Sequence, residues 1–268
     1  MLPERVAGFR RVALLRAAAV VGGLIVAGVV AFAVTAHVTG VGGANVSPTP
    51  LPAAATPTAS PPSVIDVGRM ALSRVVTIEA DRTNEEALGT GWLFDGKGDF
   101  VTNAHVVAGA LTVRITDRRA RTHLATVLGS DPTLDVAVVR SADGFSGAPL
   151  PVDSAALGPL PIDVVDIASS RATGHDDLTE ASLTQTGQDV PLQPGEVQPG
   201  SNAPSIYHGM LEISGAKVYQ GNSGGPVLDS RGRVLGILTL ASPDLPDAFA
   251  IPFARIAAEV SQFAGRAG

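Results

Sequence analysis

Short runs of β-branched and other apolar residues alternate with glycine- and aspartate-rich turns along most of the chain. This pattern predicts β-strands, because β-branched residues favour extended backbone and the turn residues end each run. The predicted strands cover residues 73–80, 89–94, 100–103, 111–116, 123–128, 135–140, 163–168, 180–185, 210–214, 226–229, 234–240 and 249–251. Short, regularly spaced strands of this kind are typical of an antiparallel barrel or sandwich.

Two helices and one long loop complete this region. A short helix is predicted over residues 63–72 and an amphipathic helix over residues 252–263. We interpret the second as a packing helix, because its large apolar side chains fall on one face. A loop between Gly187 and Ser205 contains four prolines and is longer than a connection needs to be, so it is either functional or disordered.

The pattern changes at the N-terminus, where residues 17–36 contain no charged residue. As a helix this segment would be about 30 Å long, enough to cross the hydrocarbon core of a membrane. Residues 1–16 are rich in arginine, so we expect them on the cytoplasmic side and everything after residue 36 outside. We therefore predict a transmembrane helix that acts as a signal anchor. The alternative is a cleaved signal peptide, because the small residues at 34–36 suit a signal peptidase.

Residues 37–63 are rich in proline, alanine and threonine. Such a segment cannot bury apolar area, and its prolines favour the extended polyproline II conformation. We interpret it as a linker between the membrane and a folded domain at residues 64–268. A domain of that length is large enough for one core or for two small ones.

Composition and charge exclude several classes of function. The 268 residues include no cysteine, which excludes disulfides and thiolate metal sites. Four of the 19 basic residues but only one of the 25 acidic residues lie in residues 1–16, which leaves 15 basic and 24 acidic residues in the rest. A part this acidic is a poor candidate for nucleic-acid binding, which depends largely on phosphate neutralisation. We expect neither a cofactor nor a metal ion.

The segment GNSGGP at residues 221–226 predicts a sharp turn that presents one hydroxyl group. Its glycines relax the backbone and its proline lacks an N–H donor, so it cannot continue a helix or an ordinary strand. A serine hydroxyl is a poor nucleophile unless a base removes its proton and donors stabilise the resulting oxyanion. Ser223 is therefore a candidate nucleophile if other residues supply a base and donors.

One histidine and one aspartate have the right context to support Ser223. His105 follows a predicted strand and precedes two valines, so a polar side chain stands at a strand end between apolar flanks. Asp135 opens an apolar strand, where a carboxylate is costly unless it is hydrogen-bonded. Asp131 precedes Pro132 and is more typical of a turn. The other histidines are more typical of surface or packed positions: His37, His123, His175 and His208.

In four motifs the chain resembles the trypsin-like serine proteases, and most closely their bacterial HtrA/Deg branch. The motifs are GTGW at 89–92, VTNAHVV at 101–107, DPTLDVAV at 131–138 and GNSGGP at 221–226. The order His, Asp, Ser matches as well, and the resemblance covers residues 70–265. It implies an all-β fold of two six-stranded antiparallel barrels (chymotrypsin-like) with a C-terminal helix, here preceded by one transmembrane helix.

The resemblance also implies catalytic roles. His105 would be the general base, Asp135 its orienting carboxylate and Ser223 the nucleophile, and the backbone N–H groups of Gly221 and Ser223 would form the oxyanion hole. Asn222 stands where zymogen-activated members carry an aspartate, so activation by a new N-terminus is not expected. The family's Gly-Asn-Pro-like segment is missing around residues 167–174, which leaves open whether the resting oxyanion hole is formed.

Substrate recognition is implied by the same resemblance. Thr239, Leu240 and Ala241 match the strand that pairs with the substrate backbone, which is binding by strand addition. Lys217 lies where the family lines its first specificity pocket, and an inward lysine would favour acidic side chains. The alternative, which we prefer, is that Lys217 points to solvent.

Together these features predict a membrane-anchored, extracytoplasmic serine endopeptidase without a PDZ domain, acting on polypeptides through an acyl-enzyme. One alternative is an inactive protease-like module that holds peptides by strand addition. Another is an esterase that uses the same triad. The sequence leaves the physiological substrate and the oligomeric state open.

Overall fold

The computed structural model describes residues 62–152, 157–175, 178–192, 204–241 and 247–267. The predicted cytoplasmic segment, the predicted transmembrane helix and nearly all of the predicted linker lie outside these residues, so they stay predictions. None of the helices formed by the described residues is long and apolar enough to cross a membrane.

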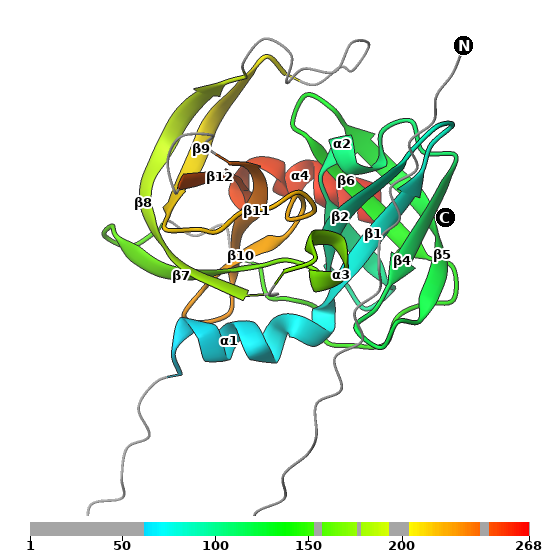
Figure 1. The fold of residues 1–268 in the computed structure, drawn as a ribbon, viewed down its shortest axis with the longest axis horizontal. Helices are drawn as coiled ribbons and strands as arrows, with labels where there is room; N and C mark the ends of the chain where they lie inside the picture. The colour runs from blue at the N-terminus through cyan, green and yellow to red at the C-terminus, as the bar shows by residue number, and fades with distance from the viewer. Residues whose placement is uncertain (1–61, 153–156, 176–177, 193–203, 242–246, 268) are drawn as a thin grey trace, which may run out of the picture. The chain divides into compact units, whose positions relative to one another are not determined.

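Twelve strands form two closed antiparallel barrels, as predicted (Figure 1). The first barrel closes in the order β1-β2-β3-β6-β5-β4 and the second in the order β10-β11-β12-β9-β8-β7. The strands of the first barrel are β1 (Val75–Asp81), β2 (Glu86–Leu93), β3 (Asp99–Thr102), β4 (Thr112–Thr116), β5 (Thr122–Asp131) and β6 (Val136–Ser141). Those of the second are β7 (Ile162–Ile167), β8 (Leu178–Pro191), β9 (Ile206–Ser214), β10 (Pro226–Asp229), β11 (Val234–Ala241) and β12 (Asp247–Pro252).

In the described part of the chain, four α-helices and one 3-10 turn accompany the barrels. They are α1 (Val64–Ala71), η1 (Leu72–Arg74), α2 (Ala104–Val107), α3 (Ser170–Thr173) and α4 (Phe253–Ala264). Helix α1 packs on β7, β8 and β10 of the second barrel, whereas α4 contacts β5 and β6 of the first barrel and β11 and β12 of the second (Figure 1). The predicted C-terminal packing helix is therefore confirmed, and it connects the two barrels.

Helix α1 begins at a cap that the sequence supplies. The hydroxyl of Ser63 accepts a hydrogen bond from the backbone N–H of Asp66 at 3.3 Å, which satisfies one of the free donors of the first turn. Gly68 allows the helix to approach β7 closely, because an added Cβ there would come 2.9 Å from a methyl carbon of Val165. The cap thus stabilises the start of the helix, and Gly68 allows the helix to pack closely on the second barrel.

Successive residues of the central strands pack into different apolar clusters, because side chains of a strand alternate between its two faces. In β6, Val136 and Val138 face a cluster shared by both barrels, whereas Val139 faces the interior of the first barrel. In β7, Val165 joins the shared cluster and Val164 the interior of the second barrel. Burial on both faces explains why these strands are nearly continuous apolar runs.

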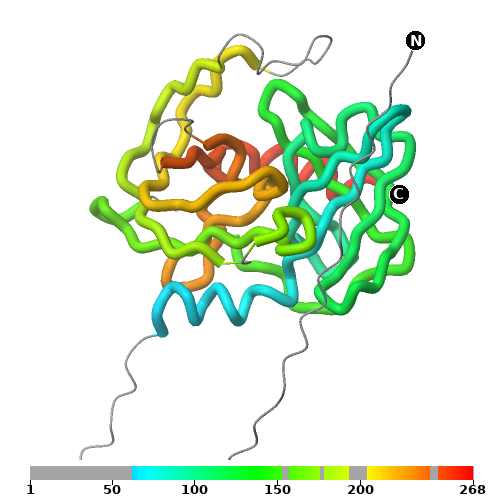
Figure 2. The backbone as a smooth tube through the Cα atoms, viewed as in Figure 1, coloured from blue at the N-terminus to red at the C-terminus, as the bar shows by residue number. Residues whose placement is uncertain are grey.

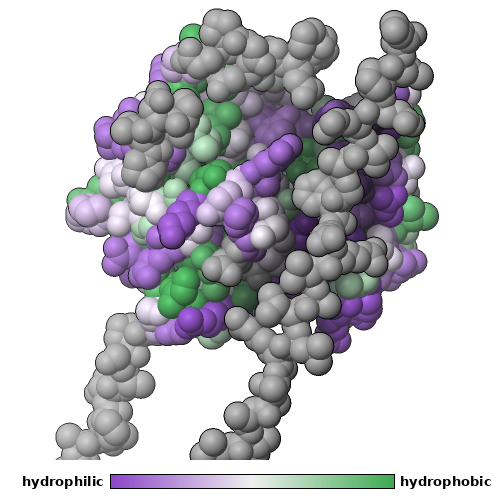
Figure 3. Space-filling model, in the orientation of Figure 1, coloured by the Kyte–Doolittle hydropathy of each residue, from purple (hydrophilic) through white to green (hydrophobic). Residues whose placement is uncertain are grey.

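The outer surface of this unit is mixed in character. In the view of Figure 3, hydrophilic residues predominate among the described atoms and hydrophobic residues occur in small groups between them.

The segment between β9 and β10 extends from the second barrel toward the first, as the backbone trace shows (Figure 2). This segment carries Ser223.

The expected loop between Gly187 and Ser205 is wrong in its boundaries. Residues 187–191 belong to β8, which pairs with β9 as far as Pro191 and Ile206. The register between the two strands shifts three times between Leu183 and Val190, and Gly187 has a φ of 76°. Bulges of this kind place glycine and polar residues inside a strand, which is why the sequence pattern resembled a loop. Residues 193–203 lie outside the described residues.

Candidate active site

His105 and Asp135 form a hydrogen-bonded pair. The Nδ1 atom of His105 lies 2.8 Å from Oδ2 of Asp135, and the backbone N–H of His105 donates to Oδ1 at 2.9 Å. The His105 side chain is 41% exposed and that of Asp135 is 2% exposed. The carboxylate is therefore buried beneath an imidazole ring whose other side is open. A carboxylate in this position favours the tautomer that carries a proton on Nδ1 and leaves Nε2 free to accept one.

Local structure places both residues at strand ends. His105 lies in α2, which begins directly after β3, and the guanidinium of Arg82 donates to the His105 backbone oxygen at 2.8 Å. Asp135 lies between β5 and β6 with a φ of 51°, in the left-handed region. The Asp131 side chain accepts hydrogen bonds from the N–H groups of Thr133 and Leu134, which confirms Asp131 as a turn residue.

Two residues outside the predicted site connect this pair to the second barrel. The hydroxyl of Tyr207, in β9, donates to Oδ2 of Asp135 at 3.0 Å. The amide of Asn103 donates to the backbone oxygen of Asp135 at 2.8 Å and to the hydroxyl of Thr239, in β11, at 3.0 Å. Burial, and next the charge of Asp135, raise the pKa of Tyr207 far above its usual range, so the hydroxyl stays protonated and donates.

Residues 219–222 form a tight turn just before Ser223. The N–H of Asn222 donates to the carbonyl of Tyr219 at 3.1 Å, and Gly221 has a φ of 99° whereas Gln220 is not among the residues with positive φ. These values define a type II turn, which requires a positive φ at its third residue and therefore favours glycine. An added Cβ at Gly221 would lie 2.7 Å from the backbone carbon and oxygen of Ala172, in α3.

Thr90 fixes this turn to the first barrel. Its hydroxyl donates to the carbonyl of Gly221 at 2.7 Å, and its N–H donates to the carbonyl of Ser223 at 2.9 Å. The N–H of Ser169 in turn donates to the Thr90 hydroxyl at 3.0 Å. Because the carbonyls of Gly221 and Ser223 are both held by one residue of β2, the serine segment has a defined position between the barrels.

Gly89 lies between the two halves of the site. An added Cβ there would come 2.7 Å from both γ-carbons of Val106 and 3.2 Å from the carbonyl oxygen of Ser223. Val106 follows His105 in α2, so the segments that carry His105 and Ser223 lie against the same strand. Within the described residues the His105 ring bonds to Asp135 and not to Ser223, which is half-buried.

The predicted oxyanion donors are not used inside the protein. Across the described part of the chain, neither the N–H of Gly221 nor that of Ser223 donates to another group, whereas the N–H groups of Asn222, Gly224 and Gly225 all do. Two free donors on either side of one residue can bind an oxygen that develops negative charge.

Asn222 is buried and bonded on both sides of its amide. Its oxygen accepts from the N–H of Tyr219 at 2.9 Å, and its nitrogen donates to Oδ2 of Asp166, in β7, at 2.9 Å. This polar pair joins the turn to β7 and is buried, because Asp166 is 1% and Asn222 2% exposed.

The predicted substrate-binding residues divide into two groups. In β11, Thr239 lies at a register shift and is buried, Leu240 is half-buried, and Ala241 is exposed. Strand β10 pairs with β11 only between Val234 and Ile237, so beyond that point the edge facing away from β12 has no strand partner among the described residues. A free edge of this kind can accept an extended peptide.

Lys217 is exposed, as the solvent alternative expected. It lines a cavity of about 270 Å³ together with His175, Glu180 and Tyr219. The rings of His175 and Tyr219 stack with their centroids 3.6 Å apart. The structure therefore does not bring Lys217 together with the free edge of β11 around Thr239 in one site.

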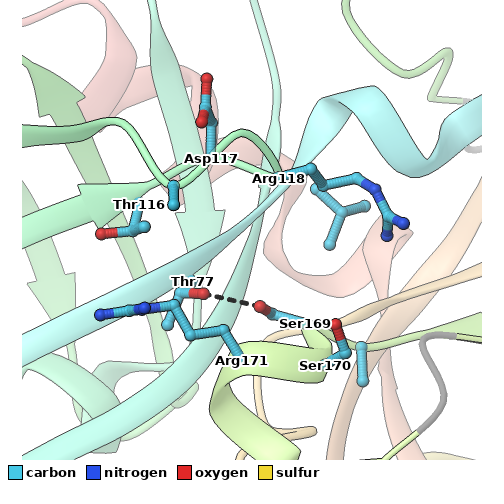
Figure 4. Close-up of a pocket in the computed structure, with 10 residues that line it drawn as sticks. Thr77, Thr116, Asp117, Arg118, Ser169, Ser170 and Arg171 are labelled. Carbon is cyan, nitrogen blue, oxygen red and sulfur yellow. Dashed lines mark hydrogen bonds between the residues drawn. The ribbon is translucent and has the colours of Figure 1, made fainter.

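A second cavity of about 170 Å³ lies between the first barrel and α3 (Figure 4). Across it the hydroxyls of Thr77 and Ser169 are 2.6 Å apart, and Arg171 reaches Glu79 of β1 at 2.9 Å. These contacts hold α3, and with it the backbone of Ala172 that packs on Gly221, against the first barrel. The described residues contain no cluster of three or more His, Asp or Glu side chains that could hold a metal ion.

A model of the family described as the trypsin-like peptidase domain matches residues 89–237, which is more than half of the chain. The chain therefore belongs to the trypsin-like peptidases.

Individual relatives place it near the HtrA/Deg branch, as the motifs implied. It is 36% identical over 168 residues to the putative serine protease HhoA of Synechocystis sp., covering 61% of this chain and 40% of that protein. It is 27% identical over 200 residues to the serine endoprotease DegS of Escherichia coli K12, covering 72% of this chain and 52% of DegS. The aligned parts thus span about half or less of these relatives.

Among solved structures, the chain is similar to the Rv3671c protease from M. tuberculosis in its active form. The TM-score is 0.64 at 26% sequence identity, and the match covers 82% of this chain and 96% of that one. The likeness therefore extends over most of the chain.

Proposed function

We propose that this protein is a serine endopeptidase in which His105, Asp135 and Ser223 form the catalytic triad. The observation that carries the proposal is the buried Asp135 carboxylate, hydrogen-bonded to both the ring and the backbone of His105. Helix α2, which carries His105, and the Ser223 segment both lie against β2. The free N–H groups of Gly221 and Ser223 support it further, since acyl transfer needs such donors.

The chemistry follows from these positions. The Ser223 oxygen attacks the peptide carbonyl carbon while its proton passes to Nε2 of His105, and the carbonyl oxygen becomes an oxyanion bound by the N–H groups of Gly221 and Ser223. His105 then protonates the leaving amine, and the C–N bond breaks to give the acyl-enzyme. Water, deprotonated by His105, releases the acid and restores Ser223. Asp135 stabilises the imidazolium in both halves.

The substrate we propose is an extended polypeptide. The unpaired edge at Thr239, Leu240 and Ala241 supports binding by main-chain hydrogen bonds, which an extended peptide provides and a simple ester does not. Side-chain specificity would then depend on the surfaces beside this edge rather than on Lys217, which is exposed.

Labelling with a fluorophosphonate probe tests the nucleophile. We expect the wild-type protein to be labelled and the Ser223→Ala variant not to be, because an activated serine displaces fluoride from the probe and forms a phosphonate ester. Hydrolysis of casein, lost in the same variant, separates the endopeptidase from a peptide-binding module and from an esterase. Persistent labelling of Ser223→Ala would refute the assignment, and casein binding without cleavage would favour the binding module.

We also propose the cellular arrangement that the sequence predicts. Residues 17–36 anchor the chain, residues 37–63 form the linker, and the protease domain at 64–268 is extracytoplasmic. The probe-labelled protein should then stay with membranes through a carbonate wash. Its recovery from the soluble exported fraction, with a new N-terminus near residue 37, would show that the segment is cleaved.

A further inference from the structure

Asp166 is a buried carboxyl group beside the nucleophile segment, and the proposed mechanism does not use it. It is 1% exposed, and it lies in β7 opposite Val227 of β10. Val164 and Val227 share its face of the sheet and belong to the apolar interior of the second barrel. Its Oδ2 accepts from Asn222 at 2.9 Å, while its Oδ1 has no partner within the described structure. A carboxyl group in such a place is costly, so its retention calls for an explanation.

The contacts of Asn222 connect this carboxyl group to the oxyanion donors. Asn222 closes the turn of residues 219–222 through its backbone N–H and also accepts from the N–H of Tyr219 through its side chain. Its amide nitrogen is held by Asp166. Asn222 thus bonds to both the carbonyl and the N–H of Tyr219, and Asp166 holds the Asn222 side chain in place.

The type of this turn decides where one oxyanion donor points. A type I turn differs from the observed type II turn by a flip of the central peptide, here the one between Gln220 and Gly221, which carries the N–H of Gly221. Glycine can adopt both conformations, so something outside Gly221 must select one of them.

We propose that Asp166 is a positioning residue, which holds Asn222 and thereby keeps the turn before Ser223 in the type II form that leaves the N–H of Gly221 free for the substrate oxyanion. The inference rests on the proposed function, because it concerns the oxyanion hole of that same site. Asp166 does not touch the substrate and acts only through Asn222.

The surroundings of Asp166 favour its neutral form. Burial raises its pKa to about 7, and the hydrogen bonds from Asn222 and the Ile167 backbone lower it only in part. The ionisable side chains of the neighbouring segments, His175 before β8, Glu180 in β8, and Lys217 and Tyr219 before β10, line the separate cavity of about 270 Å³. Within the described residues none of them forms an ion pair or hydrogen bond with Asp166.

The first test compares Asp166→Ala with the control Asp163→Ala, an exposed aspartate of the same strand. We expect Asp166→Ala to lower the fluorophosphonate labelling rate and kcat for a peptide substrate by about ten- to hundredfold, with KM changed less than about threefold, because the donors act on the transition state. The control should match the wild type. A wild-type labelling rate for the Asp166→Ala variant, or a change in its KM without a change in kcat, would overturn the proposal.

The route through Asn222 is tested by a double-mutant cycle. If Asp166 acts only through Asn222, Asp166→Ala should change the labelling rate less than about twofold in an Asn222→Ala background. If the rate loss of the double variant equals the product of the two single losses, Asp166 and Asn222 act independently, which would contradict the proposal. Circular dichroism spectra that match the wild type identify the variants as folded.

A conservative variant keeps the test decisive if Asp166→Ala fails to fold. Asp166→Asn preserves an acceptor for Asn222 and cannot ionise, so at pH 6 it should label within about threefold of the wild type. Above pH 7 the ratio of the wild-type rate to the Asp166→Asn rate should change, because only the wild-type side chain ionises there and the hydrogen bond from Asn222 favours the ionised form. A constant ratio from pH 6 to 9 would count against the inference. A wild-type protein that is not labelled at all would instead refute the proposed function.

Discussion

Glycine is required at position 221 by its conformation and by the space around it. Its φ of 99° lies in the left-handed region, and an added Cβ would meet the backbone of Ala172 at 2.7 Å. The first effect costs an alanine about 1–2 kcal/mol, and the second cannot be relieved by a side-chain rotation because the neighbour is backbone. One position thus combines a turn, a helix contact and a proposed oxyanion donor.

We expect Gly221→Ala to lower the fluorophosphonate labelling rate by about 10²-fold or more. The alanine would drive the turn toward negative φ, which moves the N–H of residue 221 away from the proposed oxyanion position. The rate is measured by quenching the labelling reaction at successive times and quantifying the labelled protein on a gel.

The matched control is Gly187→Ala, at a residue with a φ of 76° and nothing within 4 Å of an added Cβ. This variant carries the same kind of backbone strain without the clash and far from the Ser223 segment, so its labelling rate should equal that of the wild type. Equal rates for Gly221→Ala and Gly187→Ala would mean that the donor at 221 is unimportant.

At the scale of single residues, the sequence was sufficient to predict that His105 and Asp135 pair, and the structure contains their hydrogen bond. Each lies in a motif of contiguous residues with a chemical reason for its context. Tyr207 and Asp166 were not found, because Tyr207 meets a residue 72 positions away and Asp166 one 56 positions away. A charged residue inside the apolar run at 164–167 was the one available signal for Asp166.

At the scale of elements, strands with strong β-branched character were predicted to within a few residues. Strand β10 matches its predicted range fully, and the largest error is in β8, where bulges interrupt the alternation. Helix α3 was not predicted, because four residues carry too little periodicity to show a helical pattern. Contacts between barrels, rather than local propensity, fix such short elements.

Helix α4 is the element that connects the barrels, and its apolar face should carry much of its contribution to stability. Ile256 is fully buried in the shared cluster. We expect Ile256→Ala to lower the free energy of unfolding by about 2–5 kcal/mol, because truncation removes buried methyl groups and leaves a cavity. Urea denaturation followed by tryptophan fluorescence measures it, since the single tryptophan, Trp92, lies in the same cluster.

The control for this variant is Ser261→Ala on the exposed side of α4. It removes no buried group, so the free energy of unfolding should change by less than about 0.5 kcal/mol. Similar, small losses in both variants would show that α4 does not hold the barrels together.

For the whole molecule, the two buried carboxyl groups of Glu79 and Asp166 change the free energy of unfolding in opposite directions as the pH rises. Burial raises the pKa of Glu79, but the hydrogen bonds from Arg171, Thr116 and Arg114 outweigh it, so the pKa of Glu79 is lowered overall. Its contribution to stability is present above its unfolded pKa and is lost as the pH falls toward acid. Asp166 has the opposite sign, since its pKa is raised from 3.8 to about 7.

Asp166 therefore predicts a loss of stability as the pH rises. Below pH 3.8 its carboxyl group is neutral in both states and costs nothing, whereas between pH 3.8 and about 7 only the unfolded chain ionises, which favours unfolding. The free energy of unfolding of the wild type should fall relative to that of Asp166→Asn across this range, by about 4 kcal/mol, and then stay level above pH 7. Urea denaturation at pH 5, 6, 7 and 8 measures the difference.

The control is Asp163→Asn, an exposed change in the same strand, which should leave the pH dependence of the wild-type free energy of unfolding unaltered. Parallel curves for the wild type and Asp166→Asn would mean that Asp166 ionises as freely in the folded protein as in the unfolded chain.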